Sequence, residues 1–70
     1  MNDSLGEALP KEQARVRELV QIYRDPDLNG AGEIAARMME AALKAADQAV
    51  MNGDIAAMIR AYNDLKDFTE

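Results

Sequence analysis

The residues with the clearest potential for chemistry lie between positions 25 and 33. Asp25, Asp27 and Asn29 have the spacing of positions 1, 3 and 5 of an EF-hand calcium loop, and a glycine follows at position 6. Glu33 adds a carboxylate at position 9, but position 12, which should be a bidentate Glu, is Ala36. Because that anchoring carboxylate is missing, we favour a helix that stops before a proline and is followed by an Asn-Gly turn. The calcium-binding alternative would use Asp25, Asp27, Asn29 and Glu33.

A second set of carboxylates shares one face of a predicted helix, namely Glu33, Glu40 and Asp47. Helical bundles that bind two metal ions combine such glutamates with Glu-x-x-His motifs, and this sequence contains no His. Arg37 and Lys44 each follow a glutamate by four residues, which is the spacing of helical ion pairs. We therefore interpret this face as a solvated ridge of ion pairs, and we predict neither a metal site nor a cofactor.

Enzymatic catalysis finds little support in the composition. The sequence contains no Cys and no His, which removes the common thiol nucleophile and the commonest general base. Its aliphatic hydroxyls, Ser4 and Thr69, lie near the two ends of the sequence, and there is no glycine-rich phosphate-binding loop. We expect a non-enzymatic protein without catalytic residues.

The hydrophobic pattern predicts an all-α fold. We expect a partly ordered segment over residues 1–8 and a single domain over residues 9–70. A domain of this size buries only about 60% of the surface of its unfolded chain, so helix packing or self-association must stabilise it. The three helices are predicted at about 10–24, 31–52 and 54–68.

Three residues mark the ends of these predicted helices. Pro10 suits the first turn of a helix, because its missing N–H would be unpaired there. Gly53 suits the left-handed end of the second helix, and Asp54 can cap the third. So short a turn brings the long, alanine-rich central helix and the C-terminal helix into an antiparallel hairpin.

The central helix is apolar on most of its sides, apart from the ridge of ion pairs. Small side chains recur on it at intervals of four and three residues, a pattern that lets two helix axes approach closely. Since so short a chain supplies few neighbours for this helix, we predict self-association as a dimer. The same residues could instead receive the third helix of their own chain. This predicted interface, the alanine seam, consists of Ala35, Met39, Ala42, Ala46 and Ala49.

The charge balance bears on partners and location. Thirteen acidic residues against eight basic ones give a net charge of −5, which disfavours nucleic acid and anionic membranes as partners. The sequence has no apolar run long enough to span a membrane and no secretory leader pattern, so we expect a cytoplasmic protein. Basic residues do gather in the first predicted helix, at Arg15, Arg17 and Arg24. A regulator that contacts nucleic acid, or a nucleic-acid-binding protein, is therefore the alternative function.

Two stretches resemble known families. The residues GDIAAMIRAY are similar to the turn and second helix of a tetratricopeptide repeat, and with Ala46 the resemblance covers 46–62. It implies a helical hairpin, although one repeat cannot bury its own apolar face. The matching positions after Ala46 are Gly53, Asp54, Ile55, Ile59 and Tyr62.

The combination of ALPKEQARVREL with NGDIAAMIRAYNDLK resembles small uncharacterised helical proteins encoded in bacterial prophages. This resemblance spans most of the chain and implies a phage-derived accessory factor of unknown activity. From the residues and the resemblance together, we expect a non-enzymatic helical protein that interacts with an unknown protein partner or associates with itself.

Overall fold

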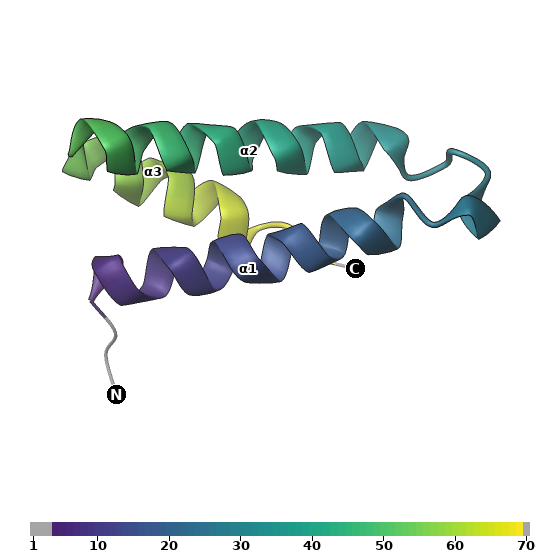
Figure 1. The fold of residues 1–70 in the computed structure, drawn as a ribbon, viewed down its shortest axis with the longest axis horizontal. Helices are drawn as coiled ribbons and strands as arrows, with labels where there is room; N and C mark the ends of the chain where they lie inside the picture. The colour runs from purple at the N-terminus through teal and green to yellow at the C-terminus, as the bar shows by residue number, and fades with distance from the viewer. Residues whose placement is uncertain (1–3, 70) are drawn as a thin grey trace.

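The computed structural model describes residues 4–69. In that range the chain forms α1 (Leu5–Tyr23), the short 3-10 helix η1 (Pro26–Leu28), α2 (Glu33–Asn52) and α3 (Ile55–Lys66), and no strand. Figure 1 shows α1 and α2 antiparallel, with α3 turning back from the end of α2 towards α1, and each helix packs against the other two. The prediction of three α-helices with an α2–α3 hairpin is confirmed. No helix in this range combines the length and the hydropathy that a membrane span requires.

The start of α1 differs from the prediction. The helix begins at Leu5 rather than at Pro10, so residues 5–8 are helical and not a partly ordered segment, while residues 1–3 lie outside the described range. Leu9 is completely buried and Leu5 packs against the core. Burying a leucine contributes about 1.5–3 kcal/mol, which is comparable with the roughly 3 kcal/mol that a proline inside a helix costs. The preference of proline for the first turn of a helix is therefore outweighed here by tertiary packing. The other helix ends lie within two residues of the predicted ones.

The linker between α1 and α2 contains more structure than a simple turn. The side chain of Asp25 accepts a hydrogen bond from the backbone N–H of Asp27 at 2.9 Å and thereby caps η1. Asn29 and Gly30 have φ angles of 52° and 82°, in the left-handed region that these residue types tolerate. Gly32 is buried against the end of α1, where a side chain would overlap backbone atoms. The linker thus fixes how closely α2 approaches α1.

The α2–α3 turn follows the sequence prediction. Gly53 has φ 63°, and its backbone N–H donates to the carbonyls of the last turn of α2. The side chain of Asp54 then accepts a hydrogen bond from the backbone N–H of Ala57 at 3.1 Å, so it caps α3. These two residues end one helix and begin the next with no residue between them, which produces the antiparallel hairpin.

The hydrophobic core lies where the three helices meet, and part of the alanine seam belongs to it. Met39, Ala46 and Ala49 are buried within the single chain, whereas Ala35 and Ala42 are half-buried. The core residues are Leu9, Val16, Leu19, Val20, Ala36, Met39, Leu43, Ala46, Ala61 and Leu65.

Candidate functional site

Exposed apolar side chains are the candidates for a binding surface. They lie in three regions, which are the end of α1 with the linker, the outward side of α2, and the α2–α3 turn with the first part of α3. On α2, Ile34 is 76% exposed and Met38 is 59% exposed. Large exposed apolar residues within the described range are Ile22, Leu28, Ile34, Met38, Val50, Met51, Ile55 and Ile59.

The outward side of α2 carries a continuous apolar stripe, which we call the α2 outer face. It consists of Ile34, Met38, Ala41 and Ala45, spaced four, three and four residues apart, so all four share one side of the helix. Each of the four is exposed to solvent. The two large residues lie towards the start of the helix and the two alanines near its middle. The face is therefore apolar along three turns, with large side chains at one end and small side chains at the other.

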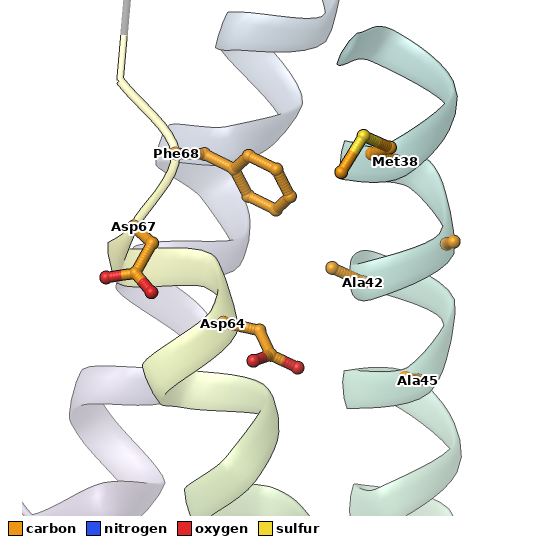
Figure 2. Close-up of a pocket in the computed structure, with 7 residues that line it drawn as sticks. Met38, Ala42, Ala45, Asp64, Asp67 and Phe68 are labelled. Atoms are coloured by element: carbon orange, nitrogen blue, oxygen red, sulfur yellow. The ribbon is translucent and has the colours of Figure 1, made fainter. Parts of the chain in front are cut away.

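A groove runs along this face, between α2 and the C-terminal end of α3 (Figure 2). Its volume is about 550 Å³. Alanine side chains form its floor on α2, because they project too little to fill the space between the helices. The ring of Phe68 points towards α2 at the level of Met38. The lining residues are Met38, Ala41, Ala42, Ala45, Asp64, Asp67 and Phe68.

One side of the groove is acidic. Asp64 and Asp67, the acidic flank, lie at the C-terminal end of α3, and their side chains make no hydrogen bond or ion pair within residues 4–69. The C-terminal end of a helix carries partial negative charge, so acidic groups there are destabilised. Two carboxylates that border an apolar groove without a cation would be stabilised by a basic partner.

The opposite side of the α2 outer face is basic. Arg37 and Lys44, the basic flank, lie seven residues apart on the side of α2 that faces away from α3. Arg37 forms an ion pair with Glu33 at 3.2 Å, yet its side chain is 74% exposed. Lys44 makes no ion pair within the described range, although the sequence predicted one with Glu40. The apolar stripe therefore has opposite charges along its two edges.

Glu40 and Glu33 belong instead to a surface network around the end of α1. Arg24 contacts Glu40 at 2.7 Å and Glu33 at 3.3 Å. These hydrogen bonds, first to Glu40 and then to Glu33, raise the pKa of Arg24. Hydrogen bonds from Arg24 and then Arg37 lower the pKa of Glu33. The network joins α1 to α2 beside the linker.

The residues of the calcium-binding alternative do not come together. Asp25 caps η1, Asn29 forms the turn after it, and Glu33 is held by two arginines. Among the described residues, no group of three acidic side chains is close enough to hold a metal ion. Asp27 lies in the first turn of η1, where its backbone N–H and not its carboxylate makes the capping bond. The geometry is that of a capped turn.

The arginines of α1 and its C-terminal end form hydrogen bonds or ion pairs with acceptors of the same chain. Arg15 donates to the carbonyl oxygens of Leu65 and Phe68, and Arg17 lies 3.8 Å from Asp47. Asp47 also accepts a 2.7 Å hydrogen bond from the buried side chain of Gln13. With Arg24 bound to glutamates, this helix does not present a row of uncompensated cations.

The α2 outer face is the functional candidate that sequence reasoning missed. Its four residues, Ile34, Met38, Ala41 and Ala45, lie outside the interface that was predicted from the sequence. The spacing of these four residues is itself a helical stripe and could have identified them. Comparison of the chain with known protein families, with curated proteins and with solved structures finds no significant match.

Proposed function

We propose that this chain is a non-enzymatic protein-interaction domain that holds another helix against the α2 outer face. The observation that carries the proposal is the exposure of Ile34 and Met38 beside a groove with an alanine floor. Contiguous exposed apolar surface on a small domain commonly marks an interaction site. A helix is the shape that fits a groove bounded by two helices.

The energetic argument is that covering this face removes two large apolar side chains, Ile34 and Met38, from solvent. Fully burying a side chain such as Ile or Met contributes about 1.5–3 kcal/mol relative to leaving it exposed. The alanine floor lets the incoming helix axis approach α2 at the low end of the roughly 8–10 Å range. The acidic flank, Asp64 and Asp67, adds a preference for basic side chains at the edge of the incoming helix.

The biological setting of the proposal comes from the sequence alone. The resemblance to small prophage-encoded proteins supports an accessory role in a bacterial cell. The alternative, a regulator that contacts nucleic acid or a nucleic-acid-binding protein, gains no support from α1, since Arg15 and Arg24 are bound within the chain. The interaction domain is the function that the geometry supports best.

The test is a site-specific photo-cross-linking residue placed at Ala41 in the α2 outer face, in the cells that produce the protein. The matched control carries the same residue at Ala14, an exposed alanine of α1. We expect a defined protein adduct from position 41 that is lost when Ala45→Glu is added. Equal adducts from positions 41 and 14, or none from either, would contradict the proposal.

A further inference from the structure

We infer that the helix which occupies the groove is α2 of a second copy of this chain, parallel to the first and related to it by a two-fold axis along the helices. The inference rests on the proposed function of the α2 outer face and names its partner. In this arrangement the basic flank of each copy lies against the acidic flank of the other.

The shape of the α2 outer face suits a parallel pair. A two-fold axis parallel to α2 places every residue of the stripe opposite its own counterpart. Ala41 and Ala45 then meet their equivalents and bring the two helices close, while Ile34 and Met38 pack at the wider end. All four side chains leave solvent in both copies, so one interface covers the whole exposed stripe.

The charges decide between a parallel and an antiparallel pair. Along the α2 outer face the acidic flank, Asp64 and Asp67, lies on one side and the basic flank, Arg37 and Lys44, on the other. A parallel two-fold pair sets the left side of one copy against the right side of the other. An antiparallel pair sets each side against its own equivalent, so like charges would meet. Only the parallel pair joins opposite charges along both edges.

The acidic and basic flanks also lie at matching positions along the axis of α2. Figure 2 shows Asp64 beside the stretch between Ala42 and Ala45, which is the level of Lys44 in the sequence. The same view shows Asp67 between the levels of Met38 and Ala42. In a parallel pair, residues of equal number lie at equal height, so Lys44 of the second copy faces Asp64. Arg37 of the second copy, whose side chain is long and mostly exposed, then extends towards Asp67 of the first copy.

The single chain leaves these groups in need of partners. Asp64, Asp67 and Lys44 have no ion pair within residues 4–69. The two aspartates stand at the end of α3 that least favours negative charge. Cations from a second copy would pair with the two aspartates and would offset their unfavourable position at the helix end. Because the pair is symmetric, the same contacts form at both edges of the interface.

The test uses charge reversal on the full chain with sedimentation over a concentration range of about 1 µM to about 1 mM. We expect the wild type to form a species of twice 7.7 kDa. Asp64→Lys with Asp67→Lys, and separately Arg37→Glu with Lys44→Glu, should each weaken dimerisation at least about tenfold. A mixture of the two variants, and a variant with all four changes, should dimerise like the wild type.

Two controls keep the test independent of folding and of net charge. Circular dichroism and thermal unfolding establish that each variant is folded, and lysines at the C-terminal end of α3 favour that helix. Glu18→Lys with Asp27→Lys changes the net charge by the same amount as Asp64→Lys with Asp67→Lys, at exposed positions away from the groove, and should leave dimerisation unchanged.

A wild type that stays at 7.7 kDa throughout the range would overturn the inference. So would unchanged dimerisation of the Asp64→Lys, Asp67→Lys variant, which is the behaviour of an antiparallel pair. In either case the cross-linking at position 41 reports separately on the proposed function. An adduct with a different protein there would retain the interaction domain and reject the second copy as its partner.

Discussion

The guanidinium of Arg15 donates a 2.8 Å hydrogen bond to the carbonyl oxygen of Phe68, from the middle of α1 to the second residue after α3. A second donor of the same side chain reaches the carbonyl of Leu65, also at 2.8 Å, and Glu12 holds the guanidinium from behind at 2.9 Å. Arg15 thus adds a charged donor to two carbonyls at the end of α3, of which that of Leu65 also accepts from the backbone N–H of Phe68 at 3.2 Å. It also fixes Phe68, which lines the groove.

Replacing Arg15 with methionine should therefore destabilise the fold. Met keeps much of the packing volume but removes hydrogen bonds from a charged donor, so we expect a loss of about 1–2 kcal/mol in the free energy of unfolding. Lysine should recover only part of this, because its point charge cannot bridge two carbonyls as the planar guanidinium does. Urea denaturation followed by circular dichroism measures the difference. Arg60→Met, at an exposed position of α3, is the control, and an equal effect of both substitutions would contradict the prediction.

Gly32 should be irreplaceable for a steric reason. Its φ is −92°, so alanine would be allowed there, but an added Cβ would overlap the carbonyl group of Tyr23 and lie 3.0 Å from its Cα. These are backbone atoms that cannot swing aside, so α2 would have to move away from the end of α1. We expect Gly32→Ala to lower the free energy of unfolding by about 2 kcal/mol or more.

The matched control for Gly32 is Gly6, in the first turn of α1. An added Cβ there meets only the Ser4 hydroxyl oxygen at 3.8 Å, an ordinary contact. Gly6→Ala should raise stability by about 0.5–1 kcal/mol, because alanine favours the helix. Thermal unfolding of both variants checks the prediction, and two shifts of the same sign would argue against it.

The sequence was most informative where one residue has one local role. Gly53 and Asp54 end and begin helices by their own backbone preferences and side-chain chemistry, and the structure shows both roles. The apolar side of α1 is equally regular in the sequence, since Val16, Leu19 and Val20 recur at helical spacing and are all buried. Pro10 misled because its local preference for a first turn was weaker than the burial of Leu9, which a local rule does not include.

The sequence was less informative where a helix is apolar over a wide arc. On α3, Ile55 and Ile59 are large apolar residues at helical spacing, yet they are 60% and 47% exposed, whereas Ala61 is buried. On α2, Ala36 and Leu43 are buried in the core while Ala35 and Ala42 are only half-buried. Periodicity shows that a helix has an apolar side, but the turn and the close approach of small residues decide which part of it meets a neighbour. The α2 outer face could be identified as exposed only from the structure, which shows which side of α2 meets α1 and α3.

The ion pairs of Glu33 make stability depend on pH in the acid range. Arg24, and after it Arg37, hold the pKa of Glu33 below its ordinary value of 4.5. The unfolded chain therefore binds this proton more readily than the folded protein does, and stability rises with pH wherever that is so. The contribution of Glu33 is fully present above about pH 4.5 and is lost as the pH falls through its lower folded pKa.

Glu33→Gln should flatten this part of the stability profile. The variant lacks the titrating group, so its melting temperature should fall less than that of the wild type between neutral pH and pH about 3. Because the pairs are exposed to solvent, added salt should reduce the difference between the two proteins. Glu18→Gln, at an exposed position of α1 outside this network, should follow the wild-type curve. If the melting temperatures of Glu33→Gln and wild type fall by the same amount through the acid range at low salt, the ion pairs with Arg24 and Arg37 do not stabilise the fold.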